Sequence, residues 1–228
     1  MNKKKQVRRI FDSIAHRYDF LNHLLSAGID FYWRKKALKL TKINSSAALL
    51  DVACGTGDFS KAALKFGVSN IVGADLSINM LRLSEDKLPM AKGLVQSVGE
   101  NLPFKNDTFS NITVAFGVRN FYNISEAFNS FYEVLKENGK VTILEFRLPS
   151  NSIVKKFYLF YFNKILPLIG RMVSKDKEAY KYLPESVNEF DTTIDLVDLM
   201  QKANFTEIEK HSLTFGIVQV VIGIKKTN

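Results

Sequence analysis

Short hydrophobic runs alternate with longer stretches of helical spacing along most of the chain. The runs consist mainly of aliphatic and β-branched residues bounded by turn formers, which is typical of strands. They cover residues 47–53, 70–76, 94–98, 111–117 and 140–146, and helical spacing occupies 58–66, 77–88 and 123–137, the last expected to stop at Asn138-Gly139. Some runs are apolar almost throughout, as strands covered by helices on both faces should be. The alternation predicts a doubly wound α/β sheet.

The last quarter of the chain has a different pattern. A helix-like stretch near residues 191–203 is followed by two strand-like runs, FTEIEKHSL and GIVQVVIGIKK, which are joined by a short turn containing Gly216. Two such runs with a short glycine turn between them favour a β-hairpin. We therefore expect the chain to end in a pair of antiparallel strands.

The N-terminal segment has the spacing of an amphipathic helix. Apolar and aromatic side chains recur at Phe11, Ile14, Ala15, Tyr18 and Leu21, so that one face of the helix is apolar. We expect residues 1–42 to form a helical lid over a ligand cleft and residues 43–228 to form the α/β core. With 228 residues, 46% of them hydrophobic, the chain suits one substantial core, and we expect a single domain.

Aromatic side chains are concentrated in the stretch IVKKFYLFYFNKILPLIGRMV, at residues 153–173. It falls within a helical insertion that we expect near residues 152–190. Two interpretations stay open: the rings pack inside the protein, or they form a groove for an apolar chain and a membrane-facing surface whose lysines reach lipid headgroups. Because four basic residues interrupt this stretch, it is too polar to span a membrane.

Composition limits the possible binding partners of the protein and the cell compartment in which we expect it. The chain has 32 basic and 23 acidic residues and a formal charge of +9, which favours nucleic acid, an anionic membrane surface or phosphate-bearing ligands. Charge interrupts the apolar residues of the N-terminus, so no signal peptide is expected. Cys54 is the one cysteine, which excludes an internal disulfide and a cysteine-rich metal site. We expect a cytoplasmic protein without a metal centre.

The most informative segment is LLDVACGTGDFS, in which an apolar strand runs into Gly55-Thr56-Gly57 and then into a helix start. Glycines let the backbone turn sharply and approach a ligand, towards which the helix N-terminal amides then point. Asp75 ends the next strand, about 20 residues after Gly55, which is the spacing at which a carboxylate reaches the ribose hydroxyls of a nucleoside. Together the two features predict a nucleoside-binding site.

The charges around this loop indicate which nucleoside cofactor fits. The GxGxxG fingerprint is absent, while Asp51 and Asp58 bracket the loop. Carboxylates here would repel a pyrophosphate but suit the amine and the sulfonium of S-adenosylmethionine. Asp58 is equally well interpreted as a helix cap, and Cys54 is interpreted as a packing residue rather than a nucleophile.

The chain resembles the ubiquinone/menaquinone biosynthesis C-methyltransferase family in five segments that occur in order: VRRIFDSIAHRYDFLNHLLSAGIDFYWRKKAL, LLDVACGTGDFS, ADLSINML, ENLPFKNDTFSNITVAFGVRNF and LEFRLPS. The first segment and FGVRN are specific to this family. The resemblance implies a Rossmann-like class I methyltransferase with an antiparallel strand in its sheet. It also implies methyl transfer from S-adenosylmethionine to a ring carbon of demethylmenaquinol or of a ubiquinol precursor. The GIDFYW form favours the menaquinone branch.

The resemblance also implies cofactor contacts at the loop and at the strand ends. The full set expected is Asp51, Gly55, Thr56, Gly57, Asp75, Leu76, Gly99, Glu100 and Ala115. The chain departs from the family at two places: it has Val98-Gly99 where Asn-Ala is common, and Ala115 where serine is common. Contacts at these positions would have to come from the backbone.

Catalytic residues are sought where the chain leaves the fourth strand, because ligands of such sheets lie beyond the carboxyl ends of the strands. There, Arg119 would stabilise a phenolate and Asn120 would orient it. Tyr18 of the lid is the third expected catalytic residue, with ordinary helix packing as its alternative. The alternative for Arg119 is an ion pair with a carboxylate such as Glu145.

Other functions stay open beside the menaquinone one. They are C-methylation in the ubiquinone pathway, methylation of nucleic acid, and a non-catalytic lipid-carrier role. Nucleic-acid methylation is disfavoured because FGVRNF replaces the Asn/Asp-Pro-Pro-aromatic motif of enzymes that methylate a flipped base. The expected partners are a polyprenylated quinol and an anionic membrane surface at the inner face of the cell membrane, but not nucleic acid. Whether the chain forms a homo-oligomer is left open.

Overall fold

The computed structural model describes residues 3–89, 91–165 and 177–226. Its described part contains a seven-stranded sheet in the order β3-β2-β1-β4-β5-β7-β6, in which β7 is antiparallel to both of its neighbours. The strands are β1 (Ala48–Val52), β2 (Asn70–Asp75), β3 (Gly93–Gln96), β4 (Phe109–Ala115), β5 (Leu135–Phe146), β6 (Phe205–Leu213) and β7 (Val218–Lys225). The predicted α/β sheet and its closing hairpin are confirmed.

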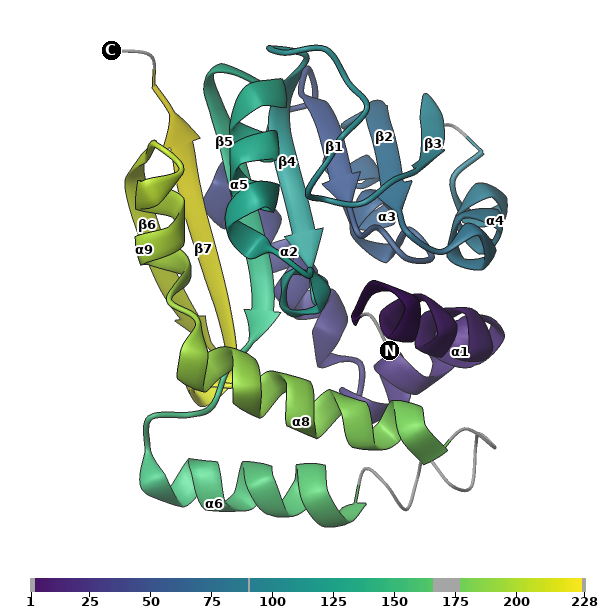
Figure 1. Cartoon of the computed structure of the whole chain (residues 1–228), viewed down its shortest axis with the longest axis vertical. Helices are drawn as coiled ribbons and strands as arrows, with labels where there is room; N and C mark the ends of the chain where they lie inside the picture. The colour runs from purple at the N-terminus through teal and green to yellow at the C-terminus, as the bar shows by residue number, and fades with distance from the viewer. Residues whose placement is uncertain (1–2, 90, 166–176, 227–228) are drawn as a thin grey trace.

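Helices cover both faces of the sheet (Figure 1). One face carries α5 (Ile124–Val134) and α9 (Leu196–Lys202), and the other carries α2 (Ile29–Thr41) and α3 (Asp58–Leu64). Phe128 and Phe131 of α5 are fully buried on the first face, and Leu38 of α2 is fully buried on the second. Burial on both sides explains why the central strands are almost entirely apolar.

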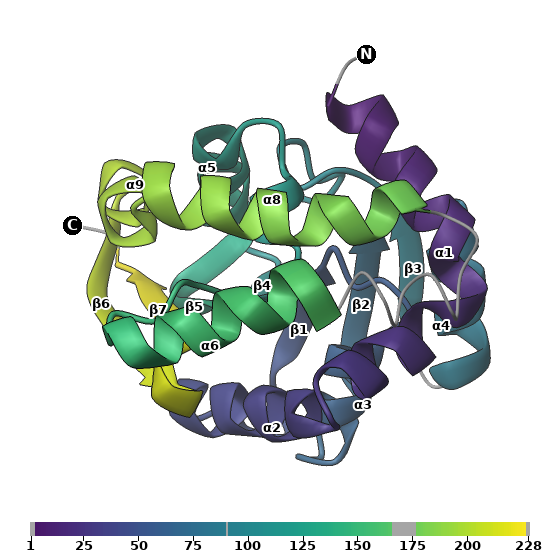
Figure 2. The same ribbon diagram turned by 90° about the horizontal axis from the view of Figure 1, so that it is seen from below.

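The carboxyl ends of the parallel strands face a third group of helices (Figure 1). These helices are α1 (Lys3–Leu25), α6 (Ser152–Phe160), its π-helical continuation η2 (Tyr161–Ile165) and α8 (Lys177–Thr193). Figure 2, seen from below, shows α6 and α8 side by side across this end, with α1 beside α4 (Ile78–Lys87). Short 3₁₀ segments, η1 (Val118–Asn120) and η3 (Thr214–Gly216), border the same end. Any ligand beyond the strand ends is therefore enclosed by helices.

Two of the predicted helices have different limits in the structure. The helix expected over 123–137 ends at Val134, because Leu135 is extended and pairs with Phe109 at the start of β5. The helix expected near 191–203 is interrupted, since Asp195 is not helical and accepts hydrogen bonds from the first amides of α9, 2.9 and 3.4 Å away. Capping by the Asp195 side chain thus decides where α9 begins.

The aromatic stretch has one buried and one exposed face. Tyr158 and Phe162 are each 6% exposed, with ring centroids 4.2 Å apart. Phe157 and Phe160 are 71% and 59% exposed. Internal packing therefore accounts for half of these rings, while residues 166–173 of the stretch lie outside the described part. No helix in the described ranges is long and apolar enough to cross a membrane.

Candidate active site

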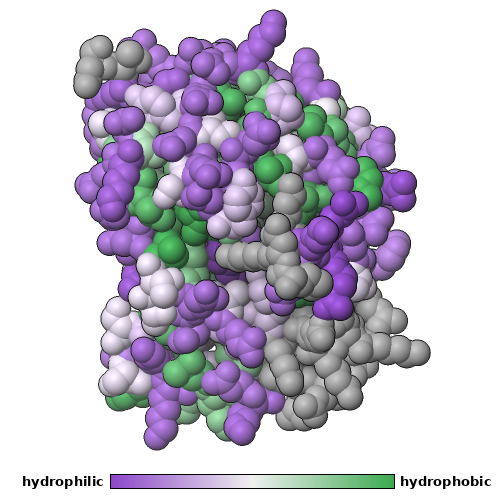
Figure 3. All heavy atoms as spheres, viewed as in Figure 1, coloured by the Kyte–Doolittle hydropathy of each residue, from purple (hydrophilic) through white to green (hydrophobic). Residues whose placement is uncertain are grey.

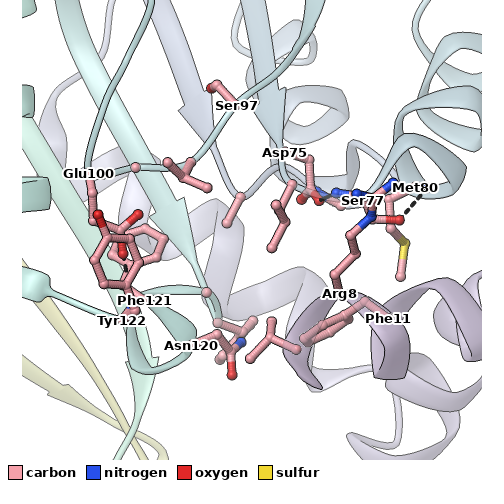
Figure 4. A pocket seen from close by; sticks show the side chains of 18 of the residues that line it. Arg8, Phe11, Asp75, Ser77, Met80, Ser97, Glu100, Asn120, Phe121 and Tyr122 are labelled. Carbon is pink, nitrogen blue, oxygen red and sulfur yellow. Dashed lines mark hydrogen bonds between the residues drawn. The ribbon is translucent and has the colours of Figure 1, made fainter. Parts of the chain in front are cut away.

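A cleft with an empty volume of about 740 Å³ lies at the carboxyl ends of β1, β2 and β4. Figure 4 shows Asp75 and Ser77 on one side of it and Glu100, Phe121 and Tyr122 on the other. Arg8 and Phe11 of α1 close it from below. The cleft is lined by six of the nine predicted cofactor residues, Gly55, Asp75, Leu76, Gly99, Glu100 and Ala115.

Asp75 is fixed by main-chain donors at the edge of this cleft. Its carboxylate accepts hydrogen bonds from the amides of Gly55 and Ser77, both at 2.8 Å. Gly55 has a φ of +56°, which an L side chain rarely adopts, and this turn lets its amide reach Asp75. Burial raises the pKa of Asp75 to about 6. A rigid carboxylate in a cleft lined by backbone fits the hydroxyls of a ribose.

The other two loop residues face the protein rather than the cleft. A Cβ on Gly57 would lie 2.6 Å from both Leu88 and Ser84, so this glycine allows the loop to pack against α4. Thr56 is buried and its hydroxyl donates to Asp19 of the N-terminal helix. A direct role of either residue in cofactor binding stays a prediction.

The two aspartates that bracket the loop have different environments. Asp51 is buried, accepts hydrogen bonds from Ser60 and Thr113, and has its pKa raised to about 6 by burial. Asp58 does not cap its helix, because the N-cap is Gly57; the capping interpretation is wrong. Asp58 instead lies 2.9 Å from the Lys87 ammonium. With this charge neutralised, the electrostatic preference for a cationic ligand rests mainly on Asp51 and Asp75.

Gly99 and Glu100 shape the far side of the cleft. A Cβ on Gly99 would lie 2.9 Å from the ring of Phe121, so glycine makes room for that ring. The Glu100 carboxylate accepts hydrogen bonds from the amides of Tyr122 and Asn123, at 2.8 and 3.3 Å. Glu100 thereby holds the segment that follows the FGVRN motif against the cleft.

A second cavity, the aromatic chamber, adjoins the cleft and has an empty volume of about 1270 Å³. Its walls come from α1, α2, β5, α6, η2, α8 and the hairpin, with rings that include those of Trp33, Phe146, Tyr158, Tyr161, Phe162 and Tyr182. Phe11, Tyr18 and Phe116 line both cavities. A cofactor in the cleft and an apolar acceptor in the chamber would therefore meet at these three side chains.

Arg119 lines the chamber and forms the ion pair that was its alternative interpretation. Its Nη1 atom lies 2.7 Å from Glu145 and 2.6 Å from the carbonyl oxygen of Phe116, and its guanidinium lies over the Phe146 ring, 5.8 Å from the centroid. Glu145 has no exposed surface. The pair fixes the guanidinium at the chamber wall, which is compatible with structural and catalytic roles alike.

Asn120 lies on the cleft side of the boundary between the cavities, whereas Tyr18 lines both of them. Asn120 accepts a 2.8 Å hydrogen bond from the hydroxyl of Tyr182 and lines the cleft. Burial raises the pKa of Tyr18, while a hydrogen bond with Asn22 and the nearby charges of Arg119 and Arg34 act in the other direction. Tyr18 is therefore a neutral phenol where both ligands would meet.

Sequence reasoning missed the polar side of the chamber and the contacts that hold α1 in place. Arg34 lies within the quoted GIDFYWRKK segment and lines the chamber, but the motif alone gave it no role. Asp12 accepts a hydrogen bond from Ser77, and Asp19 contacts Lys87 as well as the loop. Polar side chains on the outer face of an amphipathic helix gave no signal for these contacts.

Comparison with known proteins gives a consistent result. Residues 1–225 match the model of the ubiE/COQ5 methyltransferase family. A demethylmenaquinone methyltransferase of Chlorobaculum tepidum is 38% identical over 97% of this chain and 93% of its own length. A ubiquinone/menaquinone biosynthesis C-methyltransferase of Geotalea daltonii is 41% identical over 98% of this chain and 97% of its own length.

Solved structures support the fold. A methyltransferase dependent on S-adenosylmethionine from Thermotoga maritima superposes with a TM-score of 0.68 at 20% identity, over 96% of this chain and 99% of its own. A phosphoethanolamine N-methyltransferase of Haemonchus contortus, solved with S-adenosylmethionine, gives a TM-score of 0.59 at 16% identity, over 88% of this chain and 57% of its own.

Proposed function

The chain belongs to the ubiE/COQ5 methyltransferase family and is a methyltransferase that uses S-adenosylmethionine, and from this premise we propose that it methylates a ring carbon of a polyprenylated quinol. The proposed substrate is demethylmenaquinol and the product menaquinol. The relatives' names support the substrate class. The observation that carries the proposal is the aromatic chamber, which adjoins the polar cleft across Phe11, Tyr18 and Phe116.

The residues of the cleft fit the cofactor. Asp75 would accept hydrogen bonds from the ribose, and the backbone at Gly55 would approach the cofactor closely. When bound, S-adenosylmethionine supplies a methyl group on a positively charged sulfur. The protein has only to align the ring carbon with that group and to exclude water, since no covalent bond to the enzyme is required.

Arg119 would stabilise the oxygen of the quinol as it becomes a phenolate. Its guanidinium is held by Glu145 and by the Phe116 carbonyl, so its direction is set before the substrate enters. Asn120, held by Tyr182, would orient the same oxygen from the cleft side, and Tyr18 of α1 would face the reacting groups. All three roles are proposals about this chain's side chains.

Label transfer tests the reaction. Labelled S-adenosylmethionine is incubated with a short-chain demethylmenaquinol and, separately, with a demethyl-ubiquinol analogue under reducing conditions. Product from the naphthoquinol alone is the expected result, and product from both would mean that the chamber accepts either ring. Binding of the cofactor without transfer to either acceptor would contradict the proposal.

We also propose that α6 contacts an anionic membrane surface, from which a polyprenyl chain could reach the chamber. Ile153, Phe157 and Phe160 are exposed on α6 beside Lys155 and Lys156, which are also exposed. Figure 3 shows hydrophobic residues among hydrophilic ones at the lower end of the molecule, where α6 lies. Such a face suits an interface in which rings enter the lipid and ammonium groups meet the headgroups.

Co-sedimentation with vesicles tests this surface. The protein should bind vesicles that contain anionic lipid at low salt, and Phe157→Ser with Phe160→Ser should weaken binding several-fold. Ile78→Ser, which changes an exposed apolar residue on α4, is the matched control and should bind like the unaltered protein. Equal binding of the α6 variant and the control would argue against the proposal.

A further inference from the structure

Among the residues that the structure describes, one carboxylate lines the aromatic chamber. Asp30, in the first turn of α2, is 3% exposed, and it accepts a 2.7 Å hydrogen bond from Ser26 and another from Arg34. Burial acts to raise the pKa of Asp30, but the hydrogen bond from Ser26 and the charge of Arg34 outweigh it and hold that pKa below its ordinary value. The chamber, otherwise mostly apolar, therefore contains an ionised acceptor.

His23 connects this carboxylate to the outside. Its Nδ1 atom lies 2.8 Å from Asp30, and its Nε2 atom lies 3.6 Å from Asp58 on the far side of the ring. The His23 side chain is 27% exposed and stacks on Phe31, with ring centroids 4.3 Å apart. Phe31 is itself exposed. One nitrogen thus faces the chamber carboxylate and the other faces Asp58, while the partly exposed ring gives His23 its access to water.

Charges from four helices surround this pair. Besides His23 on α1 and Asp30 on α2, Asp58 comes from α3, and Arg34 and Lys87 come from α2 and α4. His23, Asp30 and Asp58 are close enough to hold a metal ion. However, Arg34 already neutralises Asp30, and Lys87 already neutralises Asp58. The arrangement therefore suits proton transfer better than metal binding.

We propose that Asp30 and His23 carry away the proton that ring methylation releases, with Asp30 touching the substrate and His23 acting through Asp30. This proposal rests on the proposed function and adds the proton acceptor to it. Side chains in hydrogen-bond contact that lead from a substrate site towards the surface can pass a proton to water.

The reaction needs such an acceptor because it releases one proton for each methyl group transferred. The quinol hydroxyl gives its proton to Asp30, and the ring carbon attacks the methyl carbon while the carbon–sulfur bond breaks, its electron pair staying on sulfur. Asp30 passes the hydroxyl proton through His23 to water and then takes the proton that the methylated carbon loses, which restores the aromatic ring and the phenolate. That second proton returns from Asp30 to the phenolate oxygen, so one proton leaves for each methyl group transferred.

Variants of His23 test the relay. His23→Gln should lower kcat by about 10- to 100-fold, while KM for S-adenosylmethionine and the cofactor dissociation constant stay close to those of the unaltered protein. His16→Gln, an exposed histidine on the same helix, is the matched control and should be fully active. Equal rates for the two variants would overturn the proposal.

Chemical rescue distinguishes proton transfer from a structural role. In His23→Ala the removed ring leaves space at a partly exposed position, so added imidazole should restore a substantial part of kcat in a concentration-dependent way. A loss of activity in His23→Ala that imidazole does not restore would overturn the relay. Asp30→Asn keeps the size of the side chain and should lose kcat without rescue by imidazole, whereas rescue of Asp30→Asn would contradict its place next to the substrate.

The proposed function and the relay can fail separately. If the unaltered protein binds the cofactor and methylates neither quinol, the proposed function fails. If it methylates a quinol and His23→Gln does so equally fast, only the relay fails.

Discussion

The cofactor cleft and the aromatic chamber share a wall but are assembled in different ways. The cleft is made largely by segments that directly follow strands, where the carboxylates of Asp75 and Glu100 accept hydrogen bonds from nearby main-chain amides, that of Gly55 among them. The chamber draws its side chains from α1, α2, α6, η2, α8 and β5, from the segment after β4, and from the hairpin turn. A cofactor site common to one fold can thus be encoded in short motifs, whereas the acceptor site depends on how distant elements pack. Acceptor specificity should therefore change with the packing of α1, α6 and α8.

Replacing Arg119 should have the largest effect, because it removes a cation from the chamber and leaves the cleft intact. Arg119→Gln should lower kcat by at least about 100-fold with nearly unchanged affinity for S-adenosylmethionine. It also leaves Glu145 buried without its ion pair, which costs about 3–5 kcal/mol of stability. Stopped-time assays of label transfer and calorimetric titration with cofactor measure the two effects.

The double variant Arg119→Gln with Glu145→Gln separates catalysis from folding. It removes both charges of the pair, so the melting temperature should recover most of the loss while turnover stays low. Turnover restored to that of the unaltered protein would remove Arg119 from the mechanism and leave it a structural role.

A variant of Asp75 tests the cofactor cleft, as the Arg119 variants test the chamber. Asp75→Asn should weaken cofactor binding by about 10- to 100-fold, as expected for the loss of a charged hydrogen bond, and should leave kcat at saturating cofactor much less affected. Because burial raises the pKa of Asp75 to about 6, cofactor affinity of the unaltered protein should fall about tenfold per pH unit below 6.

Stability of the free protein should change with pH in the opposite direction. Since the folded-state pKa values of Asp51 and Asp75, both about 6, exceed the ordinary aspartate value, the folded state binds these protons more tightly than the unfolded state. Their contribution to stability is therefore present at acid pH and lost as the pH rises from about 4 to about 6.

Asp51→Asn serves as the control for the pH dependence of cofactor affinity. Cofactor affinity that still falls below pH 6 in this variant but not in Asp75→Asn assigns the effect to Asp75.

The sequence predicted the cleft far better than the chamber, for a physical reason. A glycine turn after the first strand and an acidic residue at the end of the next strand stand in a fixed relation in nucleotide-binding doubly wound sheets, so Gly55 and Asp75 could be placed before the structure was known. The contacts of Arg34 and Tyr182 depend on α2 and α8 packing around one space, and no local pattern encodes that. Even in the cleft, the spacing could not show that Gly57 packs against α4.

A variant of Lys87 should have an intermediate effect, because this residue joins α1, the proposed lid, to the glycine loop. Its ammonium contacts Asp19 of α1 and lies 2.9 Å from Asp58 and 3.1 Å from the Thr56 hydroxyl. Lys87→Met should speed cofactor dissociation several-fold by loosening α1, and deletion of residues 1–26 should weaken cofactor retention more. Stopped-flow displacement measures both.

The exposed Lys61 of α3 offers the matched control for this test. Lys61→Met also removes one positive charge from a helix near the loop but has none of these lid contacts to lose. If Lys87→Met and Lys61→Met release the cofactor at the same rate, α1 does not act as a lid.

The smallest effect is expected at Gly99, where the cleft meets the segment that leads to the chamber. In Gly99→Ala the new methyl group would lie 2.9 Å from the Phe121 ring, so that ring must move. Because Phe121 follows Arg119 and Asn120 directly, a shift of its ring should displace side chains in both the cleft and the chamber. We expect KM for the cofactor and KM for the quinol each to rise by only a few-fold, a cost in the range of mild overpacking. If the cofactor KM alone rises, the two cavities are coupled less closely than their common wall suggests, and Phe121 belongs to the cleft alone.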